Sequence, residues 1–195
     1  LVYRNVELFS QVPVDYIVTA CATCTATISR LWPSLALPAD PALADSLKAV
    51  CRKTVDISWL MATVLDPGAV GQPVKDAPCV TYHDPCHLKK SLGVFREPRK
   101  VIASAGYAVR EMVQSDSCCG MGGSFNLTNY DVSLAIGRQK ADHIIQTGCP
   151  IVSTSCPACM MQLTDLMAGQ GQQIEVRHPV ELYARYLDIQ SAEKS

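Results

Sequence analysis

The chain has 195 residues, of which 48% are apolar and 18% are charged, as expected for one large globular domain or one and a half repeats. Its 17 basic and 18 acidic residues leave a net charge of -1, which supplies no positive field for nucleic acid. Ten cysteines are too few for a small disulfide scaffold, in which more than about 8–10% of residues are cysteine.

A repeated pattern organises the predicted elements. The segment IVTACATC at 17–24 resembles IVSTSCPAC at 151–159. Each predicts a buried strand that ends at a CxxC pair and is followed by a helix. Each copy then closes with a further strand and a capped helix, for which Asp56 suits an N-cap and Pro179 a first helical position.

The other elements follow in chain order. The first copy contains a Pro-rich stretch at 33–41, expected to be a surface loop, and a helix at 43–52. Turn residues at 66–73 indicate a linker. In the second copy the pattern predicts strands at 79–82, 108–113 and 151–155, and helices at 98–105 and 129–147.

Alternating strands and helices predict an α/β fold, a parallel sheet flanked by helices, arranged as tandem repeats with the first copy truncated. We divide the chain into the end of the first repeat (1–66), a linker (67–78), a complete second repeat (79–188) and a tail (189–195). Because residue 1 falls inside the first copy, we expect the chain to be the C-terminal part of a longer protein.

The sequence lacks the marks of membrane insertion or export. No run of about 18 apolar residues is present, and the first ten residues lack a basic start, an apolar run and a small-residue cleavage site. We therefore expect a cytoplasmic protein with reduced cysteines. Clustered cysteines in that compartment are better explained as metal ligands or redox thiols than as structural bridges.

Five cysteines of the second copy follow predicted strands. Loops at the carboxyl ends of parallel strands meet at one edge of a sheet, so these thiols should converge. Five soft ligands exceed the four of tetrahedral zinc or an ordinary cubane, and a vicinal pair favours a multinuclear site. The glycines at 120, 122 and 123 would let the backbone approach a cluster, although an ordinary flexible loop is the alternative. The five are Cys86, Cys118, Cys119, Cys156 and Cys159.

Other residues have simpler explanations. Cys51, Cys79 and Cys149 have no partner at ligand spacing and are expected to be small core residues. We interpret His83 as a strand-end residue rather than a ligand. His87 is either a donor to the cluster or a local cap. We expect His178 to cap a helix and His143 to have no special role. A basic set favours a solvated surface over a docking site; it comprises Lys89, Lys90, Arg96, Arg99 and Lys100.

Three motifs together resemble a known family: HDPCH at 83–87, CCG at 118–120 and SCPAC at 155–159. They resemble the cysteine-rich CCG domain that occurs in heterodisulfide reductase and in the iron-sulfur subunits of glycolate oxidase, lactate dehydrogenase and anaerobic glycerol-3-phosphate dehydrogenase. The resemblance implies a noncubane [4Fe-4S] cluster held by all five cysteines. Cys21 and Cys24 match only the final pair of an incomplete upstream site.

The resemblance implies an electron-transfer protein that connects a flavin-dependent 2-hydroxyacid (lactate or glycolate-type) dehydrogenase with a quinone or thiol acceptor. One alternative is a heterodisulfide reductase-like catalytic protein that cleaves a disulfide at the cluster, and another is a zinc-binding structural module. The implied partners are a flavoprotein subunit carrying FAD and a ferredoxin-type iron-sulfur domain, with no nucleic acid. The complex would lie in the cytoplasm or at the inner face of the membrane.

Overall fold

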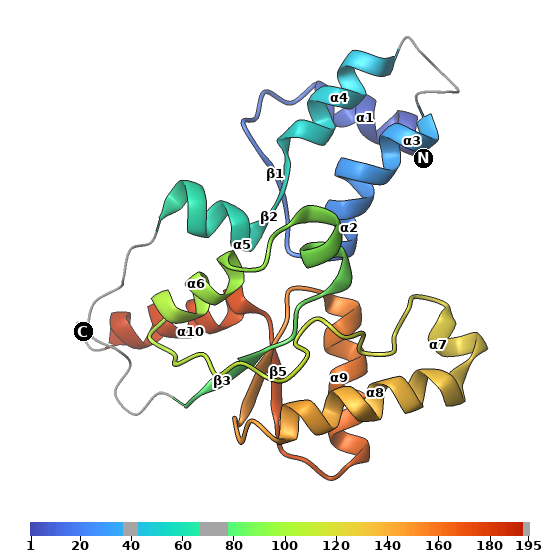
Figure 1. The fold of residues 1–195 in the computed structure, drawn as a ribbon. Coiled ribbons are helices and arrows are strands. Elements are labelled where there is room, and N and C mark those ends of the chain that lie inside the picture. Colours follow the sequence, from blue (N-terminus) through green and yellow to red (C-terminus); the bar gives the residue numbers. More distant parts are fainter. Residues whose placement is uncertain (37–42, 67–77, 193–195) are drawn as a thin grey trace.

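The computed structural model describes residues 1–36, 43–66 and 78–192. Its strands form two separate parallel sheets, of orders β1-β2 and β3-β4-β5, and helices pack on each of them (Figure 1). The predicted α/β class with parallel sheets flanked by helices is therefore confirmed. Most of the expected linker at 67–78 lies outside the described residues, as does the second half of the Pro-rich stretch at 33–41.

The N-terminal unit contains the two-stranded sheet. β1 and β2 pair in parallel, with Ile17 opposite Thr54 and Thr19 opposite Asp56. Asp56 caps the next helix as predicted, since its Oδ1 accepts a hydrogen bond from the Ser58 amide at 2.8 Å. The elements are α1 (Val2–Ser10), β1 (Ile17–Thr19), α2 (Ala22–Ala26), η1 (Thr27–Leu31, π-helical), α3 (Trp32–Ala36), α4 (Ala44–Lys53), β2 (Thr54–Asp56), α5 (Ile57–Leu60) and η3 (Met61–Leu65, π-helical).

Two predictions for this unit are wrong. The strand at Ile17–Thr19 is not buried, since Val18 is 41% exposed. Successive side chains of a strand point to opposite faces, and only the Ile17 face packs on the core formed with Val6 and Leu47. Residues 33–36, expected in a loop, belong to α3, because the helical segment continues without a break from α2 and η1 and packs Ile28 and Trp32 on the same core.

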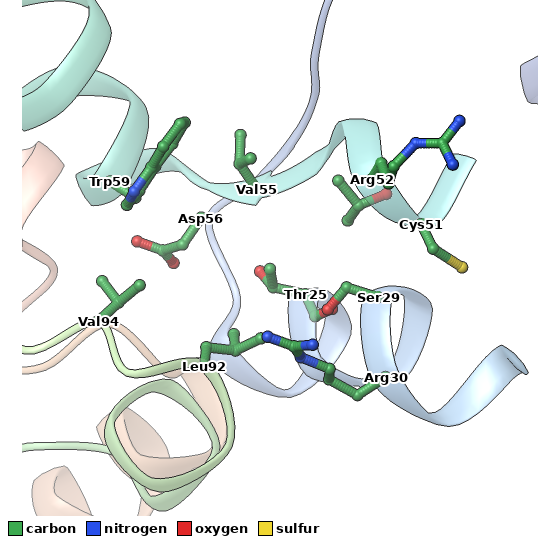
Figure 2. Close-up of a pocket in the computed structure, with 11 residues that line it drawn as sticks. Thr25, Ser29, Arg30, Cys51, Arg52, Val55, Asp56, Trp59, Leu92 and Val94 are labelled. Carbon is green, nitrogen blue, oxygen red and sulfur yellow. The ribbon is translucent and has the colours of Figure 1, made fainter. Parts of the chain in front are cut away.

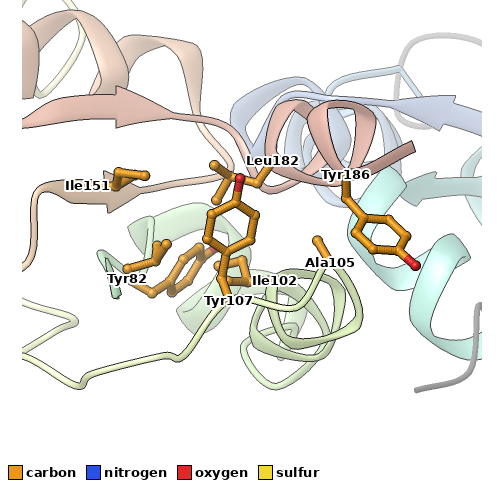
Figure 3. Close-up of a cluster of buried hydrophobic side chains, with 8 residues drawn as sticks. Tyr82, Ile102, Ala105, Tyr107, Ile151, Leu182 and Tyr186 are labelled. Carbon is orange, nitrogen blue, oxygen red and sulfur yellow. The ribbon is translucent and has the colours of Figure 1, made fainter. Parts of the chain in front are cut away.

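The C-terminal unit is built around the three-stranded sheet. Helices α6 and α10 pack on one face, against a core that includes Tyr82, Ile102 and Leu182 (Figure 3). Helices α8 and α9 pack on the other face, around Val152 and Leu163. The elements are β3 (Val80–Tyr82), η4 (His87–Ser91, π-helical), α6 (Glu97–Ser104), α7 (Phe125–Thr128), α8 (Tyr130–Ile145), β4 (Ile151–Ser153), α9 (Pro157–Gly169), β5 (Glu175–Arg177) and α10 (Pro179–Ala192).

The strand predicted at 108–113 is reduced to a single bridge between Val109 and Val80. Val80 donates to the Ala108 carbonyl and accepts from the Arg110 amide, and the ladder goes no further. The chain then turns through Gln114, whose φ of 51° is left-handed and incompatible with a strand. At the C-terminus, α10 runs to Ala192 and so includes the first residues of the tail predicted from 189.

The two units meet at the CxxC ends of β1 and β4. The amide of Ala22, at the start of α2, donates to the Ser155 carbonyl at 3.0 Å. Ala22 is fully buried against Leu88 and Cys156 of the second unit. The repeats therefore share an apolar contact beside the second CxxC. Among the described residues, no helix has both the length and the hydrophobicity that crossing a bilayer requires.

Two cysteines expected to be isolated in the core touch each other. Cys79 precedes β3, Cys149 precedes β4, and their sulfur atoms lie 2.6 Å apart. Cys149 is buried and Cys79 is partly exposed. Cys51, by contrast, is the small core residue that the sequence predicted and packs beside Val6 and Leu47.

Replacing Leu182 by alanine should destabilise the second unit, because this fully buried side chain packs between α10 and the sheet. We expect the free energy of unfolding to fall by about 2–5 kcal/mol. Urea unfolding followed by circular dichroism measures this. Leu187→Ala on the same helix is the matched control, because Leu187 is 49% exposed and should change stability little. Equal losses would contradict the assignment of buried faces.

Candidate metal centre

The five cysteines of the second unit line one cavity of about 130 Å³. Cys86 follows β3, the Cys118-Cys119 pair follows the segment bridged to β3 by Val109, and the last pair begins α9 after β4. This is the convergence expected from parallel strands. The volume greatly exceeds the roughly 10–15 Å³ that one water requires, so there is room for a group of several atoms.

The start of α9 presents two sulfur atoms to the cavity. Cys156 is the N-cap and Cys159 lies in the first turn, so the CxxC spacing places both thiols beside the free amides of the helix. A hydrogen bond from Cys159, helped by the amides of Cys159 and Ala158, lowers the pKa of Cys156 to about 5 against the effect of burial. The helix start thus favours a thiolate at Cys156.

The vicinal pair joins this helix to the Cys86 loop. Cys119 is buried and hydrogen-bonded with Cys159, whereas Cys118 is exposed and hydrogen-bonded with Cys86. Hydrogen bonds from Cys119 and Cys86 lower the pKa of Cys118. The same contact with Cys118 raises the pKa values of Cys119 and Cys86. The five sulfurs thus form a continuous series of contacts: Cys86, Cys118, Cys119, Cys159 and Cys156. Because neighbouring thiolates repel one another, all five can be ionised together only with a positive ion between them.

Gly120 fixes the loop after the vicinal pair. Its φ is +95°, and a Cβ atom there would collide with the Ser133 carbonyl oxygen of α8. Its amide donates to Cys118 Sγ at 3.3 Å, and its carbonyl accepts from the Ser133 hydroxyl at 2.8 Å. The glycine is therefore required by close contact with α8, and the loop is not simply flexible.

Two buried charges hold the loops that carry the cysteines. Asp84, two residues before Cys86, accepts a two-pronged ion pair from Arg99 at 2.8 and 3.0 Å and a hydrogen bond from Ser115. Lys140 on α8 is fully buried, and its Nζ donates to the carbonyls of Gln114 and Ser115 at 2.6 and 3.3 Å. The buried positive charge lies close enough to Cys119 for their charges to interact.

The surroundings of these two charges shift their pKa values. Burial tends to raise the pKa of Asp84, but the hydrogen bonds from Arg99 and Ser115 and the charge of Arg99 outweigh it, so the net shift is downward. Burial lowers the pKa of Lys140 to about 8. Sequence reasoning missed Lys140, although its helical spacing from Gly137 and Ile144 places it on the buried face of α8.

His83 follows β3 directly, as predicted, and also contributes to the cavity. It is fully buried and lines the cavity, and its ring lies with Cys119 and Cys159 in a group whose donor atoms are all within 4.8 Å of one another. Burial lowers its pKa to about 4, and the charge of Lys140 adds to the shift. The sequence thus predicted its place at the end of β3 but not its place in the cavity wall. Strand alternation after Tyr82 was the available signal.

The first unit contributes a residue that the sequence did not single out. Thr23, inside the first CxxC, lines the cavity, and its Oγ1 lies 3.7 Å from Cys156 Sγ. The same hydroxyl lies 3.1 Å from Nδ1 of the exposed His87. His87 therefore contacts the cysteines through Thr23. His178 caps α10 as predicted, since its Nδ1 accepts a hydrogen bond from the Val180 amide.

Cys21 and Cys24 do not line this cavity. They end β1 and begin α2, where the Cys24 amide donates to Cys21 Sγ at 3.4 Å. Cys24 is exposed, and burial together with the nearby Cys24 and Cys156 thiols raises the pKa of Cys21. Within the described parts of the chain, no third cysteine, histidine or carboxylate lies close enough to form a metal site with them.

A second cavity, of about 300 Å³, lies between α2, η1 and β2 (Figure 2). Thr25, Ser29 and Arg30 form one wall, and Asp56 and Trp59 lie on the other side. Burial raises the pKa of Asp56 to about 6. This cavity contains only one cysteine, Cys51, and so lacks the donors of a cluster site.

The basic set is largely engaged within the fold. Lys89 pairs with Asp84 and Asp116, Arg99 with Asp84 and Glu111, and Lys100 with Asp66. Arg96 lies over the ring of Phe95. Three of the five basic residues are therefore paired with carboxylates of the same chain, and the choice between a solvated surface and a docking site stays a prediction.

The donor set fits an iron-sulfur cluster. Five thiols surround one cavity, thiolate is the ligand that such clusters prefer, and a tetrahedral zinc site would leave one thiol without a metal. Both ring nitrogens of His83 are buried without a hydrogen bond of good geometry, so the cavity wall contains polar atoms that the protein alone does not fully satisfy.

Comparison with known families identifies the chain. A model of the cysteine-rich domain, CCG, matches residues 1–29 and 80–164, which together make up more than half of the chain. The chain belongs to this family. The second matched segment contains all five cysteines of the cavity, and the first contains Cys21 and Cys24.

Some relatives of this cysteine-rich domain protein are named as iron-sulfur proteins or as subunits of oxidoreductases. Lactate utilization protein A of Exiguobacterium is 29% identical over 91% of the chain and 71% of its own length. One component of the dihydromethanophenazine:CoB-CoM heterodisulfide reductase of Methanosarcina barkeri is 28% identical over 98% of the chain and 46% of its own length. An uncharacterized iron-sulfur protein of Methanococcus maripaludis is 34% identical over 83% of the chain but only 29% of its own length. These matches support an iron-sulfur cluster.

Replacing Gly120 by alanine should disrupt the cavity, because the new methyl group meets the Ser133 carbonyl at a left-handed φ. We expect reconstituted protein to hold much less iron than wild type and to melt at a lower temperature. Gly123→Ala is the control, since Gly123 has a similar φ of +64° but open space around its Cβ position. It should incur only the backbone cost of about 1–2 kcal/mol. Equal iron loss in both variants would show that contact with α8 is unimportant.

Asp84→Asn should change how stability depends on pH. The folded-state pKa of Asp84 is lowered, so its ionised form stabilises the fold above the unfolded pKa of about 3.9, and this is lost as the pH falls through the folded value. At pH 7 the variant should be about 1–3 kcal/mol less stable, and the difference should shrink below pH 4. Urea unfolding between pH 7 and pH 3 measures it. Asp165→Asn is the control and should change stability little at pH 7, because Asp165 is exposed.

Proposed function

We propose that this chain is the cysteine-rich part of an iron-sulfur oxidoreductase subunit. It would relay electrons from a flavin-dependent dehydrogenase of the lactate or glycolate type to a quinone or thiol acceptor. The observation that carries the proposal is the set of five thiols around one cavity, between loops held by Asp84 and Lys140. The name of the lactate utilization relative supports this direction.

The proposed ligands of a [4Fe-4S] cluster, of the noncubane type, are Cys86, Cys118, Cys119, Cys156 and Cys159. Such a cluster supplies one-electron chemistry when bound. The protein orients the five sulfurs, directs the Gly120 amide at Cys118 and places the Thr23 hydroxyl beside Cys156. Lys140 adds a buried positive charge near Cys119, which favours the more negative, reduced state.

The proposed partners are a flavoprotein subunit that carries FAD and a ferredoxin-type iron-sulfur domain. The complex would work in the cytoplasm or at the inner face of the membrane. The relative from Methanosarcina barkeri is by name one subunit of a heterodisulfide reductase, which is consistent with partner subunits. The second repeat, from 79 onward, would hold the functional cluster, and the first repeat would cover one side of it through Ala22 and Thr23.

A second candidate is disulfide cleavage, as in the heterodisulfide reductases. The relative from Methanosarcina barkeri supports it, and so does the exposure of Cys118 at the cavity, which would let a small thiol or disulfide approach. One experiment separates the two candidates. Cluster-loaded protein is reduced anaerobically, and one sample receives an organic disulfide while another receives a quinone analogue. Oxidation of the cluster by the disulfide supports disulfide cleavage, whereas oxidation by the quinone alone supports the relay.

Replacing Cys119 by serine should destroy or convert the cluster, because this buried sulfur contacts both Cys118 and Cys159. Anaerobic purification with iron and acid-labile sulfide analysis measures the loss. Cys51→Ala is the matched control and should keep about four irons, the number in a [4Fe-4S] cluster. A colourless protein containing zinc, or a cluster lost only in Cys51→Ala, would contradict the proposed ligands.

Cys21→Ser should leave the iron content of this chain nearly unchanged. Cys21 and Cys24 lie outside the cavity and have no third donor nearby among the described residues. The iron content of variant and wild type, prepared side by side, decides the point. A fall by half would mean that the first CxxC holds iron in this chain.

A further inference from the structure

His83 reaches the cavity because of its place at the end of β3. Its amide donates to the Ser153 carbonyl at 2.9 Å, which continues the pairing of β3 with β4 by one bond. Tyr82 packs on the face covered by α6 and α10. The next side chain must point to the other face, where α8, α9 and Cys119 lie.

Neither nitrogen of the His83 ring makes a hydrogen bond of good geometry, although the Ser115 backbone lies close enough to contribute a weak one. Nδ1 and Nε2 are both buried without a well-formed hydrogen bond, although a buried polar group almost always has one. His87, four residues later, contrasts with it, because its Nδ1 lies 3.1 Å from the Thr23 hydroxyl. A packing role alone would leave two poorly satisfied polar atoms in the wall of the cavity.

Two sulfur atoms lie beside this ring. One nitrogen of His83 and the Sγ atoms of Cys119 and Cys159 are all within 4.8 Å of one another. All three side chains line the same cavity. Neutral imidazole is the commonest nitrogen ligand for metals in proteins, and it replaces cysteine on one iron in some iron-sulfur centres.

We propose that His83 is a sixth protein ligand of the metal centre and binds iron through a ring nitrogen beside Cys119 and Cys159. This inference rests on the proposed function, because it requires a cluster at the five cysteines. A nitrogen ligand brings no negative charge. It therefore makes reduction of the centre easier than a further thiolate would.

Pulsed electron paramagnetic resonance of the reduced, cluster-loaded protein tests the proposal. Protein grown with ¹⁵N-histidine should show the strong nitrogen coupling of an iron-bound imidazole, absent in His83→Ala and retained in the control His87→Ala. The wild-type spectrum decides even if His83→Ala fails to assemble a cluster. A cluster of normal iron content without histidine coupling overturns the inference alone, whereas protein that binds no iron overturns the proposed function as well.

A different observation, at the opposite edge of the same sheet, carries a second inference. Cys79 and Cys149 precede the adjacent strands β3 and β4, and their sulfur atoms are 2.6 Å apart. This is well inside the roughly 3.5–4.0 Å at which nonbonded heavy atoms pack. Cys149 is 2% exposed, whereas Cys79 is partly accessible.

We infer that Cys79 and Cys149 form a reversible disulfide with each other. The oxidant is a low-molecular-weight disulfide. The Cys79 thiolate attacks the oxidant and releases one small thiol, and the Cys149 thiolate then displaces the second. Two protein thiols are oxidised to one bond while the small disulfide is reduced to two thiols. The bond would join β3 to β4 at the ends remote from the cluster cysteines.

Anaerobic, cluster-loaded protein treated with a small organic disulfide tests this second inference. Peptide mapping without reductant should find one cross-linked peptide that contains both residues, and dithiothreitol should release it. In Cys149→Ser the small thiol should stay attached to Cys79. Cys51→Ser should still form the cross-link. An accessible Cys79 that carries the small thiol in wild type, without closure onto Cys149, would overturn the inference.

Discussion

The parallel pairing of β3 with β4 is the constraint on which the candidate centre depends. Because Tyr82 lies opposite Ser153, β3 and β4 end side by side. The loops that follow them therefore bring Cys86 and Cys156 to the same cavity. The bridge at Val109 brings a third segment to that edge, and with it the vicinal cysteines. Five thiols from widely separated parts of the sequence become neighbours because hydrogen bonds between backbones fix where each loop begins.

Charge and close contact then hold the loops that the strands deliver. Asp84 joins the loop before Cys86 to α6 through Arg99 and to the loop before Cys118 through Ser115. Lys140 binds that second loop from the side of α8, and Gly120 lets the same helix approach the vicinal pair. These polar contacts are internal to the fold. They would keep the sulfurs close to one another before any metal is bound, which lowers the conformational cost of binding.

The sequence was sufficient for the fold class, the cysteine-bearing loops and most helices of the second unit. These depend on local periodicity and on a general rule of parallel sheets. The predicted strand at 108–113 failed because only Val109 pairs, and residue-level preferences do not reveal where a ladder stops. The exposure of Val18 was missed for a related reason. Whether a strand is buried depends on how many elements cover it, which the strand's own residues do not specify.

The missed residues at the centre all act across long distances in the chain. Thr23 belongs to the first CxxC and touches Cys156 of the second, a contact that no local pattern contains. The orientation of His83 could have been predicted from alternation along β3, but its proximity to Cys119 and Cys159 required the packing of α8 and α9. The contact of Cys79 with Cys149 could have been suspected, because both precede strands that pair.

The contact of Ala22 with Ser155 has a consequence for how such repeats can be separated. The second unit contains all five cysteines of the cavity, but the first unit covers one side of its CxxC helix. The covering groups are the amide and methyl group of Ala22 and the hydroxyl of Thr23. A protein cut before residue 79 would expose Cys156 and Leu88 to water. The two units therefore depend on each other at this shared surface, so a substitution at Ala22 or Thr23 of the first unit would also change the surroundings of Cys156 in the second.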